Sequence, residues 1–362
     1  MKKTVKLLAL LVCAAMLLSF TACNKDADKD VPSGMQIASA PGADFRLYIP
    51  TSWNPNIAYG VSGGYASLSR LSNVSMVKYP ITEEMQAQLP APDAENASND
   101  RIDWFYTTQC RPTLQAISLQ GSFVEVEEKK PDMINRLNAI RYHEKGNIDG
   151  QTVHFVQVIT ERANAFYVFS FIVLDELYER LYNDVEEMLN YFVFSDTPYL
   201  PDSYLKSLNT SAKAPEGMQL ASNGEVAYKF YAPKDWIVNR DERIFSAYVA
   251  DDRTSVSVIP YMPDGSNIST QDLFAMSEQS MKATAGIDGY ELFSHDSEVT
   301  LAKRPADRYH YRYTVGGTSY HYIQVIAAYK DKLYCVTYTA LPAYFDAHLA
   351  EFESILSAFE FK

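Results

Sequence analysis

Hydrophobic and polar residues alternate over three successive stretches in the middle of the chain, and the same arrangement returns in its last third. The first set lies at residues 137–145, 151–160 and 165–173, and the second at 304–314, 318–328 and 332–340. The turn-forming pairs between neighbouring stretches include Asp149-Gly150, Gly316-Gly317 and Lys330-Asp331. Alternation with a period of two, interrupted by such short turns, predicts three antiparallel strands in each set.

The two sets belong to a duplicated unit. Ala139-Ile-Arg-Tyr-His143 returns as Ala306-Asp-Arg-Tyr-His310 at an offset of 167 (306 − 139). Further upstream, Gly34-Met-Gln-Ile-Ala-Ser39 matches Gly217-Met-Gln-Leu-Ala-Ser222 at an offset of 183 (217 − 34). A constant offset over many positions indicates duplication. The difference of 16 (183 − 167) places 16 additional residues in the first copy, between Tyr79 and Arg136.

Each copy begins with a strand that stops at a proline. Phe45-Arg-Leu-Tyr-Ile-Pro50 precedes Trp53, and Tyr228-Lys-Phe-Tyr-Ala-Pro233 precedes Trp236. Proline ends a strand because it has no backbone N–H to donate. Both tryptophans are expected to fill the core rather than to bind a ligand.

Helical spacing follows each three-strand set. Apolar residues recur three and four positions apart at Tyr178, Tyr182, Val185, Leu189 and Phe192, and again at Phe345, Leu349, Phe352, Leu356 and Phe359. Such a stripe predicts an amphipathic helix that packs on the sheet. An internal helix is expected to begin near Asp100 in the first copy. In the second, Ser269-Thr-Gln-Asp272 resembles a capping box that opens a helix toward Thr284.

The N-terminus has the features of a lipoprotein leader. Three lysines precede an apolar run from Leu7 to Leu18, and small residues stand directly before Cys23. This resembles the lipobox of bacterial lipoproteins, in which the cysteine is lipidated and becomes the mature N-terminus. The predicted organisation is a signal peptide at 1–22, a tether at 23–33, repeat 1 at 34–196, a linker at 197–216 and repeat 2 at 217–362.

The residues also resemble a known fold family. The strand ending at Pro233 before Trp236, the Ala306-Asp-Arg-Tyr hairpin, the strand Leu333-Tyr-Cys-Val-Thr-Tyr338 and the helix leading into Leu356-Ser-Ala-Phe359 are similar to the PsbP-like fold of photosystem extrinsic proteins and many bacterial lipoproteins. The resemblance implies an α+β protein with two tandem PsbP-like domains, each an antiparallel sheet layered with helices in an α/β/α sandwich. It also implies adaptor functions and supplies no active site.

Composition and charge narrow the class of protein. Hydrophobic residues make up 47% and charged residues 21%, which is typical of globular domains. The formal net charge of −13 becomes −16 (−13 − 3) once the leader and its three lysines are removed. Such a surface disfavours nucleic acid as a partner. Of the four cysteines, only Cys110 and Cys335 remain within the copies, and a disulfide between them is possible but not expected.

Two histidine pairs are the most pointed chemical candidates. Across each predicted hairpin, parity places His143 near His154 and His310 near His321. Two imidazoles side by side can hold a transition metal. Arg141 and Arg308 share the same face and oppose a cation, so a polar or half-buried sheet face is the preferred interpretation and no metal or other cofactor is predicted.

The opposite face of the second hairpin gathers tyrosines. The cluster comprises Tyr309, Tyr311, Tyr313, Tyr320 and Tyr322. If the closing helix covers these side chains, they belong to the core. If the hairpin tip protrudes, they form a recognition surface for protein or glycan.

The functional hypothesis is a non-catalytic interaction or accessory module. No nucleotide-binding loop, zinc-protease motif or nucleophile elbow occurs in the sequence. The expected location is the outer side of the cell membrane, reached through the lipid on Cys23, with another extracytoplasmic protein as the partner. A hydrolase with an unrecognised site and a ligand-binding lipoprotein remain the alternatives.

Overall fold

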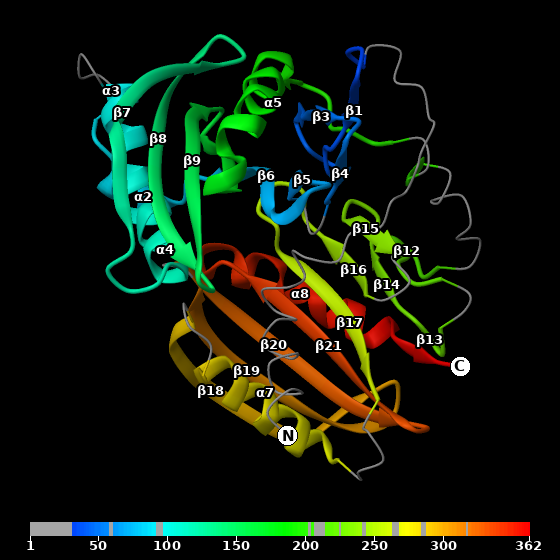
Figure 1. Ribbon diagram of the computed structural model, residues 1–362. Helices are drawn as coiled ribbons and strands as arrows, with labels where there is room; N and C mark the ends of the chain where they lie inside the picture. The colour runs from blue at the N-terminus through cyan, green and yellow to red at the C-terminus, as the bar shows by residue number, and fades with distance from the viewer. Residues whose placement is uncertain are drawn as a thin grey trace. The chain divides into compact units, whose positions relative to one another are not determined.

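The computed structural model describes residues 31–57, 61–91, 97–201, 204–205, 214–223, 226–240, 244–262, 268–283, 287–315 and 318–362. The signal peptide and Cys23 lie outside these residues, as do most of the predicted tether and half of the predicted linker. The chain is an α+β protein with two seven-stranded antiparallel sheets (Figure 1). Its contacts form two compact units, one with the elements from β1 to β11 and one with those from β12 to β22.

The sheet of copy 1 (residues 34–196) has the order β4-β5-β6-β10-β9-β8-β7. In that order its strands are Trp53–Pro55, Ser62–Ala66, Ser69–Pro80, Ala165–Leu174, Gln151–Arg162, Leu137–Ile148 and Val124–Ile134. Two short ladders precede and follow it: β1 (Met35–Ile37) with β3 (Tyr48–Pro50), and β2 (Phe45–Arg46) with β11 (Val193–Phe194).

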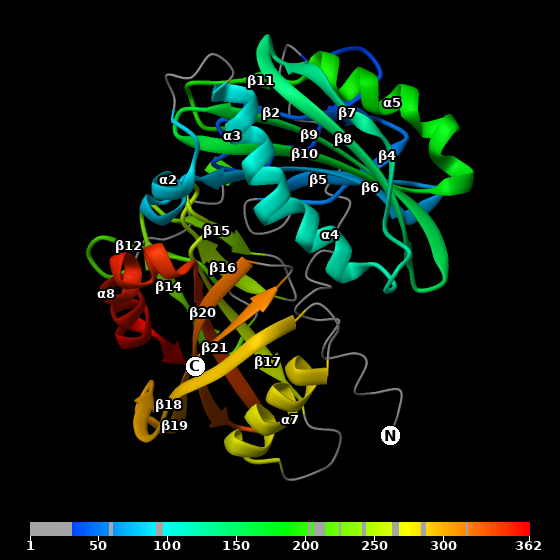
Figure 2. The same cartoon turned by 90° about the vertical axis from the view of Figure 1, so that its left-hand side faces the viewer.

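Helices cover both faces of this sheet. The helix α5 (Tyr178–Tyr191) follows a short 3-10 turn, η3 (Asp175–Leu177), and packs Val185 and Met188 into one core. The opposite face holds α2 (Glu83–Gln88) and a continuous helical run made of α3 (Ala97–Phe105), the π-helical segment η2 (Tyr106–Cys110) and α4 (Arg111–Ile117). Figure 2 shows this run crossing the strands on the side away from α5.

The sheet of copy 2 (residues 217–362) repeats the order as β15-β16-β17-β21-β20-β19-β18. In that order its strands are Ile237–Arg240, Phe245–Tyr248, Ser255–Tyr261, Lys332–Ala340, Thr318–Tyr329, Arg304–Val315 and Ile287–Leu301. The short ladders recur as β12 (Met218–Leu220) with β14 (Tyr231–Pro233), and β13 (Tyr228–Lys229) with β22 (Glu360–Phe361). The helix α8 (Pro342–Ala358) covers one face and α7 (Thr270–Ala283) the other.

The predicted strands and helices are largely confirmed. All six strands of the two hairpin sets occur within a few residues of their expected ends, as do both closing helices. The capping box of α7 forms reciprocally: the Ser269 backbone N–H donates to Asp272 Oδ2 at 3.0 Å, and the Asp272 N–H donates to Ser269 Oγ at 3.0 Å. Trp53 and Trp236 are buried in the two cores, as expected. The exact domain boundaries stay predictions.

Cys110 and Cys335 are free, buried thiols, one in each unit. Burial raises the pKa of the Cys335 thiol to about 12 and that of Cys110 still higher, so neither is activated as a thiolate. In the part of the chain that the structure describes, no helix is both long and apolar enough to span a bilayer.

Candidate functional site

The histidine pair of copy 1 lies on the sheet face under α5. Strands β8 and β9 pair Lys145 with His154 and His143 with Val156, so the two histidines are diagonal neighbours. His143 Nε2 and His154 Nδ1 are 2.7 Å apart, within hydrogen-bond distance. The hairpin argument from the sequence is therefore confirmed for this pair.

Carboxylates close both ends of the pair. His143 Nδ1 lies 3.4 Å from Glu127 Oε1, and His154 Nε2 lies 2.9 Å from Asp175 Oδ1. Asp175 Oδ1 also forms an ion pair with Lys145 Nζ at 2.7 Å. The ring of Tyr178, on α5, stacks on His154 with centroids 4.0 Å apart and planes 9° apart. We call Glu127, His143, His154 and Asp175 the histidine chain.

The hydrogen bonds of the histidine chain fix the number of protons that it must hold. The carboxylates accept hydrogen bonds, so His143 Nδ1 and His154 Nε2 must each bear a hydrogen, and the central contact needs one more. A fully bonded chain thus holds three protons on four nitrogens, one more than two neutral imidazoles supply. Burial lowers the pKa of both histidines, which disfavours that extra charge, while the flanking carboxylates favour it.

The histidine chain does not have the geometry of a general base. In hydrolase triads an aspartate holds one imidazole nitrogen and the other faces the nucleophile. Here both nitrogens of His154 are engaged, one by Asp175 and one by His143. Neither imidazole presents a nitrogen that could take a proton from a bound nucleophile.

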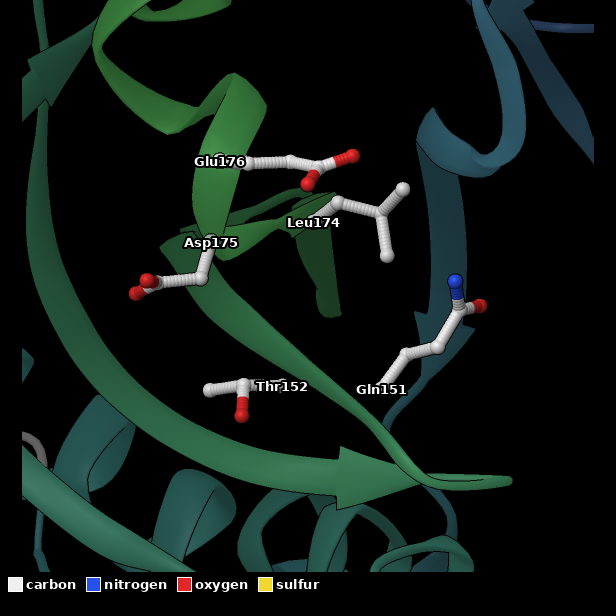
Figure 3. Close-up of a pocket in the computed structure, with 5 residues that line it drawn as sticks. All are labelled: Gln151, Thr152, Leu174, Asp175 and Glu176. Carbon is white, nitrogen blue, oxygen red and sulfur yellow. The ribbon is translucent and has the colours of Figure 1, made fainter.

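A pocket adjoins the histidine chain at Asp175. Its lining residues are Gln151, Thr152, Leu174, Asp175 and Glu176. Figure 3 shows two of them on β9 and the others at the end of β10 and in the turn that leads to α5. Among these lining residues Thr152 supplies the only hydroxyl, and the Asp175 carboxylate is already bonded to His154 and Lys145.

The histidine pair of copy 2 is arranged differently. His310 and His321 have ring centroids 5.6 Å apart and planes inclined at 58°, against 5.0 Å and 27° for the pair in copy 1. At the offset of 167, Ser294 stands where copy 1 has Glu127, and Pro342 where it has Asp175. His310 Nε2 and His321 Nδ1 are buried without a hydrogen-bond partner among the described residues.

The arginines that share these faces are already paired. Arg141 donates to Asp132 at 2.7 Å and also bonds Glu186 on α5. Arg308 bonds Glu353 on α8 at 2.5 Å. Within the described residues no group of three or more histidine, cysteine or acidic side chains is placed to hold a metal ion.

The burial of the tyrosine cluster favours a core role over an exposed recognition surface. Tyr309, Tyr311, Tyr313 and Tyr322 are buried, and Tyr320 is half-buried against them. They are covered by α7 and not by the closing helix, with Phe274 stacked on Tyr309 at a centroid distance of 3.6 Å. The proposed recognition surface at the hairpin tip is therefore not formed by the four buried tyrosines.

A buried carboxyl in copy 1 escaped the sequence analysis. Glu144 is 2% exposed and receives a hydrogen bond from the Tyr106 hydroxyl, while its Oε2 has no partner among the described residues. Burial raises the pKa of Glu144 to about 7. Its counterpart in copy 2 is Tyr311, so the difference between the copies at this position was the available signal.

Exposed apolar side chains gather at one end of copy 1. Ile117 ends α4, Leu119 lies in the following loop, and Val124 and Val126 open the edge strand β7. Their exposed fractions are 41%, 65%, 53% and 42%. The loop is fixed to the end of β8, because the Leu119 N–H donates to the Asn147 carbonyl at 2.8 Å and the Asn147 N–H donates to Ser122 Oγ at 3.0 Å. We call these four residues the apolar rim.

Comparisons with known sequences assign no family. No protein-family model matches the chain, and no curated protein matches it.

Solved structures with similar folds include three from bacteria. Cyanobacterial PsbP from Synechocystis sp. PCC 6803 matches with a TM-score of 0.34 and 17% identity, over 42% of this chain and 96% of that chain. LpqN of Mycobacterium tuberculosis, described as involved in cell envelope biogenesis, matches with 0.29 and 12%, over 40% and 89%. The type VI secretion immunity protein TplEi of Pseudomonas aeruginosa matches with 0.25 and 9%, over 91% and 97%. These identities and scores assign no function to the chain.

Proposed function

We propose that the protein is a non-catalytic binding module, held on the outer side of the cell membrane by a lipid on Cys23, and that the apolar rim of copy 1 is its contact surface for another extracytoplasmic protein. The rim is the observation on which this proposal rests. Four exposed apolar side chains lie within the ten residues from Ile117 to Val126. Contiguous exposed apolar surface is typical of interaction sites.

The rim is also preorganised. Its loop is hydrogen-bonded to the end of β8, and Phe123 between its members packs on Phe155 with centroids 6.0 Å apart. A loop already held in one conformation loses less conformational entropy on binding. The engaged nitrogens of the histidine chain further support a binding role over hydrolysis.

Site-specific photo-crosslinking in intact cells tests the proposal. A photoreactive residue replacing Ile117 should give an adduct with one protein, whereas the same residue replacing Arg180, an exposed position on α5, should not. The Ile117 adduct should disappear when Leu119→Glu and Val124→Glu are added. Equal labelling at both positions, or an adduct that survives both glutamates, would contradict the proposed surface.

The lipid anchor has its own test. Cys23→Ala should leave uncleaved precursor and abolish labelling by a fatty-acid analogue. Labelling that persists in this variant would refute the anchor without bearing on the rim.

A further inference from the structure

The histidine pair of copy 2 has two buried nitrogens that face no hydrogen-bonding group among the described residues. They are His310 Nε2 and His321 Nδ1, the same two atoms that, in copy 1, bond each other as His143 Nε2 and His154 Nδ1. A buried polar atom without a hydrogen-bond partner destabilises the folded state. The two nitrogens therefore lack hydrogen bonds in copy 2, whereas the equivalent nitrogens in copy 1 bond each other.

Aromatic rings surround this pair. Phe345 stacks on His310 with centroids 4.9 Å apart and meets His321 edge-on at 5.0 Å. The ring centroid of Phe293 lies 4.8 Å from that of His310 and 5.3 Å from that of His321. These two rings limit the number of further ligands that could approach the nitrogens.

We propose that His310 Nε2 and His321 Nδ1 bind a single monovalent coinage-metal cation, Cu(I) being the physiological candidate. Cu(I) accepts two nitrogen donors in line and needs no others, and imidazole is a suitable ligand for copper. Structural zinc takes four ligands, which this pair does not provide. A single positive charge is also less costly than two in a half-buried apolar site.

The charges near the site are compatible with a cation. Arg308 is paired with Glu353 at 2.5 Å, and Arg312 with Glu291 at 2.8 Å. Arg308 still disfavours a cation at His310 and Arg312 disfavours one at His321, whereas Asp346, on α8 beside Phe345, attracts a cation at both histidines. Burial lowers the pKa of His310 and His321, so at neutral pH protons compete little with a metal for the nitrogens.

Copy 1 supplies the internal control. His143 Nε2 and His154 Nδ1 lie 2.7 Å apart and are bonded to each other, so a metal would have to break that bond and displace the proton it holds. We expect the pair in copy 1 to remain metal-free under conditions in which the pair in copy 2 is occupied.

Imidazole nitrogen NMR on the full chain provides the test, with Ag(I) as an air-stable probe of the same charge and coordination preference. Ag(I) added beyond the amount that the two thiols bind should shift the nitrogen resonances of His310 and His321 and leave those of His143 and His154 unchanged. Cu(I), added anaerobically, should shift the same two resonances. This readout separates the site from Cys110 and Cys335, whose thiols bind the same cations.

Matched variants complete the design. His321→Phe should abolish the shift at His310, whereas His154→Phe should leave it intact. Unchanged resonances for His310 and His321 at a tenfold excess of Ag(I) would overturn the proposal. So would equal shifts in both pairs, or tighter binding of Zn²⁺ than of Ag(I) at the pair in copy 2.

Discussion

The two copies share a sheet and differ in what fills its far end. In copy 1 the helical run continues through α4, and a Cβ atom on Gly146 would lie 2.5 Å from Ser118 Oγ and 2.9 Å from Phe155 Cε2. In copy 2 the equivalent position is Tyr313, which is 1% exposed and stacks on Tyr322 with centroids 4.3 Å apart. The side chains of Ser118 and Phe155 in copy 1 thus occupy the space beside this position that the Tyr313 side chain occupies in copy 2.

The same exchange extends to buried polar groups. Tyr106 stacks on Tyr142 in copy 1 as Phe274 stacks on Tyr309 in copy 2, with centroids 3.5 and 3.6 Å apart. The Tyr106 hydroxyl bonds Glu144, whereas Phe274 has no hydroxyl and the counterpart of Glu144 is Tyr311. The two sheets therefore share an aromatic layer but differ beside it, with a hydrogen-bonded tyrosine and carboxyl in copy 1 and a phenylalanine and a tyrosine in copy 2.

Removal of Tyr313 tests this comparison with the largest expected effect. Tyr313→Ala should lower the free energy of unfolding of copy 2 by about 3–5 kcal/mol, because truncating a large buried aromatic leaves a cavity. Hydrogen exchange of the β20 amides measures the loss in that copy. Tyr320→Ala, at the half-buried neighbour, should cost clearly less. Equal losses would mean that Tyr313 is no more part of the core than Tyr320.

Glu144 should make the stability of copy 1 depend on pH. Its folded-state pKa, about 7, lies above the value of 4.5 expected when unfolded. The protonated form is the one that the fold favours, so stability is full below about pH 4.5 and falls as the pH rises to about 7. The difference between these two pKa values corresponds to about 3 kcal/mol in the free energy of unfolding. Urea unfolding at pH 5 and pH 8, monitored by exchange of the β9 amides, measures it.

Glu144→Gln is the control for that pH dependence. The amide keeps the shape of the side chain and does not ionise, so the contribution of position 144 should vanish and the variant should be more stable than the parent at pH 8. Copy 2 has Tyr311 at this position and therefore lacks this contribution to the pH dependence. An unchanged pH slope in the variant would assign the slope to other groups.

The histidine pairs should respond unequally to the same substitution. His154→Phe in copy 1 keeps an aromatic ring beside Tyr178 but removes the bonds to His143 and Asp175, and should cost about 1–3 kcal/mol. His321→Phe in copy 2 removes a nitrogen that has no partner among the described residues and should cost less than about 1 kcal/mol. Similar costs, measured by hydrogen exchange in each sheet, would contradict the unequal bonding of the two pairs.

Sequence reasoning succeeded where the pattern is local. The strands of the hairpins and the stripes of α5 and α8 follow from periods of two and of three to four residues, and the start of α7 from its capping box. The outer strands β7 and β18 were not predicted. Their register shifts interrupt the alternation that identifies a strand, and β7 is mostly exposed.

The parts of the site that could not be predicted depend on tertiary contacts. Glu127 and Asp175 approach the histidines from an edge strand and from a turn, and neither acid recurs in copy 2. The burial of Glu144 could not be expected, because isolated carboxylates are rarely buried. The tyrosines were correctly gathered on one face, but which helix covers that face follows only from the packing of α7.

The smallest effect on stability is expected at the edge strands, where the two copies differ in the setting of their exposed apolar residues. Leu119→Ser and Val124→Ser, on the apolar rim of copy 1, should each change the free energy of unfolding by less than about 0.5 kcal/mol, since exposed side chains lose little on truncation. Leu292→Ser, at a 41% exposed position on β18 of copy 2, should be equally mild. Only the rim substitutions should weaken capture of the protein that crosslinks at Ile117, because the fixed loop that groups the rim belongs to copy 1. If Leu292→Ser weakens capture as much as Leu119→Ser does, the contact surface is a property of both edge strands and not of the additional residues of copy 1.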